Sequence, residues 1–191
     1  MTPTRPSAWR GVAGIAGCLL LAWFSVVRGV RVPLLGLADL GFHELGHLLT
    51  YPFPDVVTAA MGSIAQVAVP LGLAAYFALV RGDLVASGLC LAWAGTSARD
   101  VAAYIADAPY QRLELIGGEH DWAFVLGPEH LDALDAAGSV AAAMGVAGVL
   151  LLLAGAGCCL WDLLREQRRR APRPPPRPSL PAFGFGGRGG T

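Results

Sequence analysis

Four long apolar runs constrain the fold of this chain more than any other feature of its sequence. They cover residues 11–27, 56–80, 84–108 and 136–160. A stretch of about 20 mostly apolar residues is long enough to cross a bilayer as an α-helix. Hydrophobic residues make up 54% of the chain and charged residues only 15%, whereas a soluble globular domain carries roughly 25% charged residues. We therefore predict an all-α, polytopic transmembrane helix bundle, and we exclude a soluble enzyme and a disulfide-stapled secreted domain.

A fifth, shorter apolar stretch covers residues 34–51 and has two interpretations. Pro33 suits the first turn of a helix, and Pro52 and Pro54 close it. If this helix spans the membrane, the amino terminus lies outside. If it only dips into the membrane, the amino terminus lies inside. Both interpretations stay open, so the bundle is expected to have four to five spans.

Charge divides the chain into two parts. Residues 1–164 hold seven arginines against 13 acidic residues, whereas residues 165–191 hold seven arginines against Glu166 alone. We predict that residues 1–164 form the transmembrane bundle, with a polar loop at 109–132, and that residues 165–191 form a disordered Arg/Pro/Gly-rich tail. The positive-inside rule places this tail in the cytoplasm and the 109–132 loop outside. Membrane lipids are the expected partners, and a nucleic-acid partner is excluded. The oligomeric state does not follow from the sequence.

The stretch at 34–51 contains the sequence His43-Glu44-Leu45-Gly46-His47. Residues four apart share one face of a helix, so both imidazoles can bind one metal ion. Glu44 lies about 100° further round the helix than His43, where it can deprotonate a metal-bound water. Zn²⁺ fits this pattern because it takes nitrogen and oxygen ligands tetrahedrally and leaves a position for water. The alternative is a buried histidine pair whose hydrogen bonds go to backbone carbonyls.

The third metal ligand has several candidates. Polar residues three and four apart form a stripe along the run 84–108: Trp93, Ser97, Asp100, Tyr104 and Asp107. Such a stripe must face protein or water. The midpoint of His43 and His47 lies about six residues, or roughly 9 Å, before the end of its helix. If both helices end at the same membrane face, Asp100 lies at a similar depth and is the first choice, while Asp107 is nearer the surface and could instead cap its helix.

The polar loop offers a rival ligand in the sequence Gly117-Gly118-Glu119-His120-Asp121-Trp122. A flexible glycine pair could let the loop fold over the metal, so that His120 becomes the third ligand and Asp121 orients an imidazole. The third ligand therefore stays open among Asp100, Asp107, His120 and Asp121. Small residues inside the runs indicate close helix packing: Gly62, Gly72, Gly88 and Gly95.

The HExxH sequence on a membrane helix resembles the intramembrane zinc metalloproteases of the site-2 protease family, peptidase family M50. The resemblance implies that His43 and His47 bind zinc, that Glu44 is the general base, and that an aspartate on a later transmembrane helix is the third ligand. A narrower resemblance is to an uncharacterised group of small bacterial M50-like membrane proteins. It rests on four segments: residues 42–44, 97–100, 104–108 and 117–122. This resemblance implies a multi-pass protein of the bacterial plasma membrane.

These observations predict a membrane-embedded zinc metallopeptidase that hydrolyses peptide bonds at or within the bilayer, with a membrane protein or a peptide as its substrate. One alternative is a membrane protein that binds a metal without catalysis. Another is a zinc hydrolase that acts on a lipid or another non-peptide amide. Glu44 separates catalysis from simple metal binding, because hydrolysis requires its carboxylate and binding does not.

Overall fold

The computed structural model describes residues 8–115 and 119–170, which contain six α-helices and no strand. The helices are α1 (Ala8–Ala22), α2 (Leu35–Thr50), α3 (Asp55–Tyr76), α4 (Leu84–Asp107), α5 (Asp121–Leu126) and α6 (Ala137–Arg170). Short π-helical turns continue α1 over Trp23–Val27 and α3 over Phe77–Arg81, and a 3₁₀ turn at Leu134–Ala136 leads into α6. The expected all-α class is therefore confirmed for this part of the chain.

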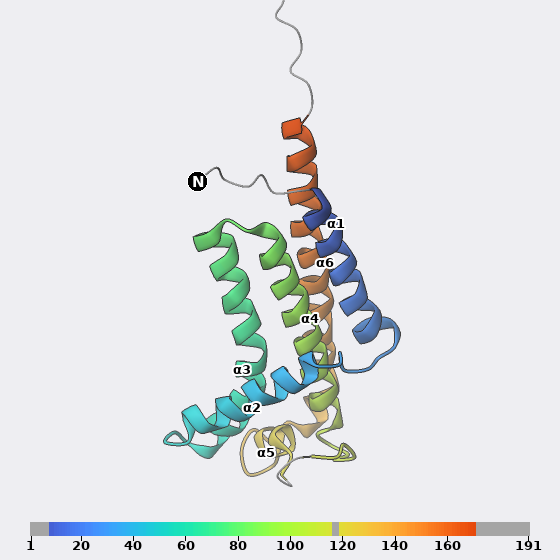
Figure 1. Ribbon diagram of the computed structural model, residues 1–191. Coiled ribbons are helices and arrows are strands. Elements are labelled where there is room, and N and C mark those ends of the chain that lie inside the picture. Colours follow the sequence, from blue (N-terminus) through green and yellow to red (C-terminus); the bar gives the residue numbers. More distant parts are fainter. Residues whose placement is uncertain (1–7, 116–118, 171–191) are drawn as a thin grey trace, which may run out of the picture.

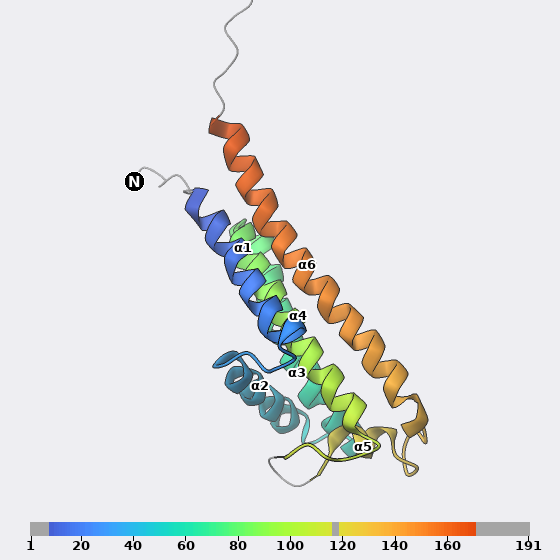
Figure 2. The ribbon, with the colours of Figure 1, turned by 90° about the vertical axis from the view of Figure 1, so that its right-hand side faces the viewer.

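Four of these helices lie side by side, and the other two lie at one end of the group (Figures 1 and 2). Helices α1, α3, α4 and α6 form the bundle, while α2 lies obliquely across the end where α3 begins and α4 finishes. The short helix α5 lies at the same end, which we call the site end. The start of α1, the α3–α4 turn and the last residues of α6 lie at the opposite end, the terminal end.

Three helical segments of the described chain are long and apolar enough to cross a membrane. They are Trp9–Val27, Asp55–Arg81 and Leu134–Arg169. The stretch at 34–51 is not among them, and its helix α2 is inclined to the bundle rather than aligned with it. Both ends of the described chain lie at the terminal end. Both interpretations of the stretch at 34–51 stay predictions.

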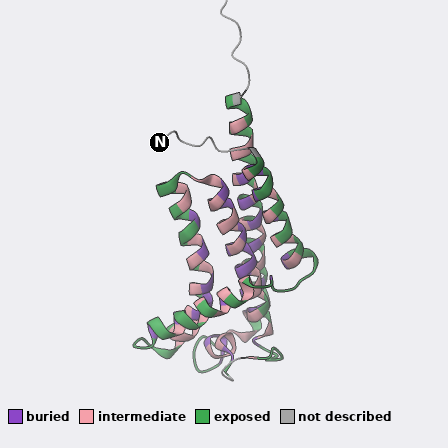
Figure 3. Cartoon of the chain, viewed as in Figure 1, coloured by how far each residue is buried: buried purple, intermediate pink, exposed green. Residues whose placement is uncertain are grey.

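Helices α4 and α6 pack closely because glycines face each other along their contact. A Cβ atom built on Gly88 would lie 2.5 Å from the carbonyl oxygen of Gly155, and one built on Gly95 would lie 2.6 Å from that of Gly148. No real side chain fits at these distances, so these four residues, the glycine seam, bring the two backbones together. Buried residues follow the inner sides of the long helices (Figure 3).

The terminal end is held by contacts between the first helix and the rest of the bundle. Nη2 of Arg10 lies 2.6 Å from Oδ2 of Asp83, in the turn between α3 and α4. The thiols of Cys18 and Cys159 lie 4.0 Å apart and are buried between α1 and α6. These contacts fix the register of α1 against α4 and α6.

Two boundaries differ from the sequence-based expectation. Helix α6 runs to Arg170, so residues 165–170, which were expected in the disordered tail, are helical. Arginine, glutamate and glutamine are good helix formers, and no proline follows before Pro172. The rest of the expected tail, residues 171–191, lies outside the described residues. The predicted polar loop at 109–132 also contains a helix, α5.

Candidate metal centre

The crossing of α2 over α3 brings both histidines of α2 against a glycine of α3. At Gly46 a Cβ atom would lie 2.8 Å from the carbonyl carbon of Met61, so the two backbones touch at that point. At Gly62 a Cβ atom would lie 2.6 Å from Nε2 of His47 and 2.7 Å from Nε2 of His43. The bare backbone of Gly62 therefore leaves the space in which the two Nε2 atoms meet.

A backbone hydrogen bond sets the orientation of the His47 ring. Its Nδ1–H donates to the carbonyl oxygen of Thr58 at 2.8 Å, which leaves the Nε2 lone pair free for a ligand. The Thr58 hydroxyl in turn donates to the carbonyl oxygen of Thr50, at the end of α2. These bonds tie α2 to the first turns of α3, so the imidazole is fixed by both helices.

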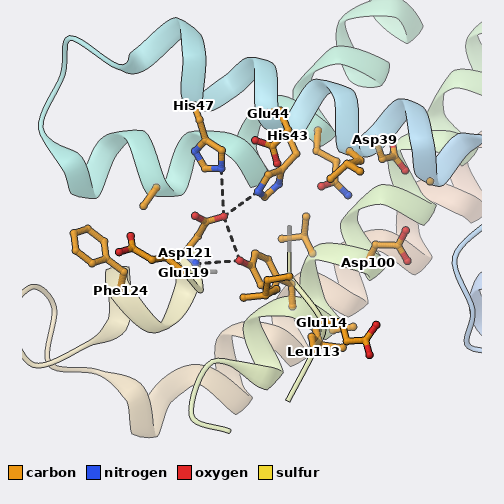
Figure 4. A pocket seen from close by; sticks show the side chains of 18 of the residues that line it. Asp39, His43, Glu44, His47, Asp100, Leu113, Glu114, Glu119, Asp121 and Phe124 are labelled. Atoms are coloured by element: carbon orange, nitrogen blue, oxygen red, sulfur yellow. Dashed lines mark hydrogen bonds and ion pairs between the residues drawn. The ribbon is translucent and has the colours of Figure 1, made fainter. Parts of the chain in front are cut away.

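Asp121, the first residue of α5, completes a group of three candidate ligands (Figure 4). Its Oδ2 lies 2.9 Å from Nε2 of His43 and 3.4 Å from Nε2 of His47. One ligand atom from each of the three side chains lies within 4.8 Å of the other two. Imidazole nitrogen and carboxylate oxygen are the ligand atoms that transition metals such as zinc prefer. This group could hold a metal ion.

Tyr104 of α4 holds Asp121 in place. The backbone N–H of Asp121 donates to the phenol oxygen at 3.0 Å, and the phenol O–H donates to Oδ2 of Asp121 at 3.3 Å. The same tyrosine ring stacks on the imidazole of His120, with ring centroids 4.2 Å apart. Both the backbone and the carboxylate of Asp121 are therefore positioned by one side chain of the bundle.

His120 and Trp122 fix the helix that carries Asp121. His120 is the N-cap of α5, and its Nδ1 accepts a hydrogen bond from the N–H of Ala123. Burial lowers the pKa of His120, although Asp107 and Asp121 oppose this shift. The imidazole is therefore neutral, as an acceptor at Nδ1 requires. On the other side, the indole N–H of Trp122 donates to the hydroxyl of Ser63 on α3 at 3.0 Å.

The two residues that the sequence favoured as the third ligand lie elsewhere. Nε2 of His120 is buried 3.5 Å from Oδ2 of Asp107, and the group of three candidate ligands does not include it. Asp100 lines the same cavity but lies toward its other end, together with Asp39 (Figure 4). Asp100 would lie at the depth of the histidines if α2 were aligned with α4, but α2 is inclined. A ligand role for Asp100 or for His120 stays a prediction.

The polar stripe of α4 does face protein, as its spacing predicts. Trp93 and Ser97 both donate hydrogen bonds of 2.8 Å to Oδ1 of the buried Asp39 on α2. The carboxylate of Asp107 accepts from the backbone N–H groups of Arg112 and Leu113. Asp107 therefore orders the loop that follows α4.

A cavity of about 820 Å³ opens in front of the candidate ligands. Glu44 lines it beside His43, and most of the other charged residues in its wall are also acidic (Figure 4). The acidic residues are Asp39, Asp55, Asp100, Glu114, Glu119 and Asp121. Arg31 is a basic residue of the same wall. The site therefore combines three candidate ligands, a free carboxylate and enough room for a short peptide segment.

Two residues of this site have a larger part than their sequence context suggests. Asp121 was one of the four open choices for the third ligand, but it was favoured there as a residue that orients an imidazole, and its signal was its position beside His120 in the polar loop. Gly62 was considered only as a packing residue. Nothing in a single sequence distinguishes a glycine that faces a ligand from one that faces another helix.

Comparisons with family models, with curated proteins and with solved structures give no significant match for this chain. The resemblance to the site-2 protease family is therefore an expectation from the sequence motif.

Proposed function

We propose that this chain is a membrane-embedded zinc hydrolase that cleaves peptide bonds of membrane-associated substrates. The observation that carries the proposal is the convergence of His43, His47 and Asp121 beside a further carboxylate, Glu44, in one cavity. Two histidines and one carboxylate are a common ligand set of catalytic zinc, which keeps a fourth position for water or substrate. When bound, zinc supplies a Lewis acid and brings the pKa of its water to about 7.

Each residue of the chain has a distinct task in this proposal. His43, His47 and Asp121 hold the metal, and Tyr104 keeps Asp121 in position through two hydrogen bonds. Glu44 is exposed to the cavity one residue after His43, where its carboxylate can take a proton from water and return it to the leaving amine. The cavity wall binds the substrate segment and orients its scissile bond.

The placement in the membrane is also a proposal. We assign four spans, namely α1, α3, α4 and α6, because α4 lies alongside the three apolar helices and is about 36 Å long. Helix α4 is less apolar than the other three, but residues of its polar stripe bond to α2 and α5. The basic end of α6 supports a cytoplasmic position for the terminal end, following the positive-inside rule. The site end then lies at the outer face of a bacterial plasma membrane.

The test compares zinc content with hydrolysis. Purified wild type is expected to hold about one zinc ion per chain, and His43→Ala is expected to hold none. Glu44→Gln is expected to keep its zinc and to lose the hydrolysis of a fluorescence-quenched peptide library. Glu129→Gln, at an exposed position outside the cavity, is the matched control and keeps both properties.

Two outcomes would overturn parts of this proposal. A folded wild type that takes up no zinc would remove the metal centre. Zinc binding without any Glu44-dependent hydrolysis of peptides would leave a membrane protein that binds metal, or a hydrolase of another amide.

A further inference from the structure

Helix α2 has an apolar face that no part of the described chain covers. Leu37, Leu45 and Leu48 share one side of the helix, and Leu49 lies beside them. Leu37 and Leu48 are 70% and 71% exposed. The opposite side carries His43, His47 and the buried Asp39 into the cavity. We call the four leucines the leucine face.

The lengths of the bundle helices indicate the depth in the membrane at which the leucine face lies. About 19 residues of helix separate Gly62, which contacts the histidines, from Arg81 at the terminal end, a rise of roughly 28 Å. About 21 residues separate Tyr104, which holds Asp121, from Asp83, a rise of roughly 31 Å. The hydrocarbon core of a bilayer is about 30 Å thick. If the charged terminal end lies at one boundary of this core, the candidate metal centre lies at the other boundary.

We infer that the leucine face of α2 lies among the acyl chains of the outer leaflet, so that the metal centre is held at the membrane–water boundary. The inference rests on the membrane placement given under Proposed function. Helix α2 starts beside the middle of the bundle and descends to the site end, so its inclination carries it through that leaflet (Figure 1). An amphipathic helix at this level buries its apolar side in lipid and keeps its polar side on the protein.

The residues after α2 have the character of a membrane boundary. Tyr51 and Phe53 follow the helix and are 82% and 58% exposed. Aromatic side chains are enriched at this level of membrane proteins, where one part of the ring contacts apolar chains and another part contacts water. The first apolar helix, which precedes α2 in the chain, also exposes apolar side chains, among them Leu19 and Leu20.

This placement narrows the substrate class. The cavity lies on the inner side of α2 and is rich in carboxylates, so it contains water. A peptide bond reaches it where a chain leaves the bilayer and its backbone is no longer in a helix. The expected substrates are segments that immediately follow a membrane span, rather than bonds in the middle of the bilayer.

The test measures the depth of single nitroxide labels in vesicles of phosphatidylcholine and phosphatidylglycerol. Cysteines replace Leu48 and, in separate variants, Leu19 and Tyr110, in a chain whose four native cysteines are alanine. Leu19 is the lipid-facing control, and Tyr110 is an exposed residue of the loop after α4. The label at 48 is expected to collide with oxygen several-fold more often than with a water-soluble nickel complex, as at position 19. The label at 110 is expected to show the reverse.

Two results would overturn the inference. Equal access of the nickel complex to positions 48 and 110 would place the leucine face in water. Protection of position 48 from both reagents would place it against protein. If the cysteine-free chain does not fold, the difference in quenching by brominated lipids between Leu48→Trp and the native chain, which already holds five tryptophans, gives the same answer. Zinc content is measured on the same samples. A sample without zinc contradicts the proposed metal centre, whereas a zinc-loaded sample with a water-exposed label at position 48 contradicts only the proposed depth of the leucine face.

Discussion

The glycine seam and the candidate metal centre (His43, His47 and Asp121) are built in opposite ways. Along the seam, the backbones of α4 and α6 lie in direct contact over several turns, and no side chain separates them at Gly88 or Gly95. At the metal centre, three helices that do not share such a seam each contribute side chains: α2 gives two histidines, α5 gives Asp121 and α4 gives Tyr104. One region is held by many contacts between backbones, and the other by a few polar contacts.

Substitutions in the two regions are therefore expected to affect different properties: the stability of the bundle for the seam, and metal binding for the candidate metal centre. A change in the seam moves two long helices apart and affects the whole bundle. A change at the metal centre moves one side chain beside a cavity of about 820 Å³, and the surrounding helices stay where they are.

The largest effect is expected from a side chain inside the seam. In Gly155→Leu the new Cβ atom meets the carbonyl oxygen of Gly88, and no flexible atom can give way. We expect a loss of about 3 kcal/mol or more in the free energy of unfolding, since backbone shifts of this kind cost most of the stability of a small bundle. Thermal unfolding in detergent, followed by circular dichroism, measures it.

The matched control lies two residues further along α6. A Cβ atom on the exposed Gly157 meets nothing within 4 Å, so Gly157→Leu is expected to leave the melting temperature unchanged or to raise it. Equal destabilisation by both substitutions would show that the glycine seam does not determine the packing of α6.

A smaller substitution at the metal centre is expected to remove the metal without unfolding the chain. In Gly62→Ala the added methyl group lies 2.6 Å from Nε2 of His47 and 2.7 Å from Nε2 of His43, so both imidazoles must turn away. We expect zinc affinity to fall by about 10- to 100-fold or more, as displaced ligands generally cause. Competition with a chromophoric chelator measures the affinity.

Gly72→Ala on the same helix is the control, because a Cβ atom there meets nothing within 4 Å. It is expected to keep wild-type zinc affinity. If Gly62→Ala also binds zinc as wild type does, the ion is not held between the two histidines.

The third ligand can be tested by comparing two carboxylates of the same cavity. Asp121→Asn removes the charged oxygen nearest to both imidazoles, so zinc affinity is expected to fall by at least about 100-fold. Asp100→Asn lies toward the other end of the cavity and is expected to change the affinity by no more than a few-fold. The visible spectrum of the cobalt-substituted protein reports whether a ligand has changed. A larger loss in Asp100→Asn would restore the choice that the sequence favoured.

The smallest effect is expected at the Arg10–Asp83 ion pair of the terminal end. Hydrogen bonds from Ala86 and Arg10 hold the pKa of Asp83 below its usual value, although partial burial acts against this. Because the pKa of Asp83 is lower in the folded than in the unfolded chain, its carboxylate stabilises the fold at pH values above the unfolded pKa of about 3.9. This contribution is lost as the pH falls through the pKa of the folded state. Asp83→Asn is therefore expected to cost less than about 1 kcal/mol at pH 7. Its melting temperature should approach that of wild type below pH 4, and a gap that widens on acidification would contradict this.

The seam and the metal centre also differ in how far the sequence predicts them. Helix ends were predictable because prolines, glycines and charges mark them: the run at 84–108 becomes α4 (Leu84–Asp107), and the stretch at 34–51 becomes α2 (Leu35–Thr50). The shared face of His43 and His47 follows from their spacing of four. These are local properties of the chain.

The partner of the histidines was harder to predict because it depends on two non-local facts. One is the inclination of α2, which places its histidines near the end of α4 rather than level with Asp100. The other is the short helix within the polar loop, which begins at Asp121 and is fixed by Tyr104 and Ser63. Neither fact is encoded by a local pattern of residues.

The pairing of α4 with α6 also has a consequence for how the chain is made. Ribosomes release α4 about 30 residues before α6 begins. Until α6 arrives, α4 has α1, α2 and α3 to cover it, and the glycines of its other side face lipid or the insertion machinery. The last helix to be synthesised is thus the one that completes the core, and a chain that stops before it leaves α4 uncovered on that side.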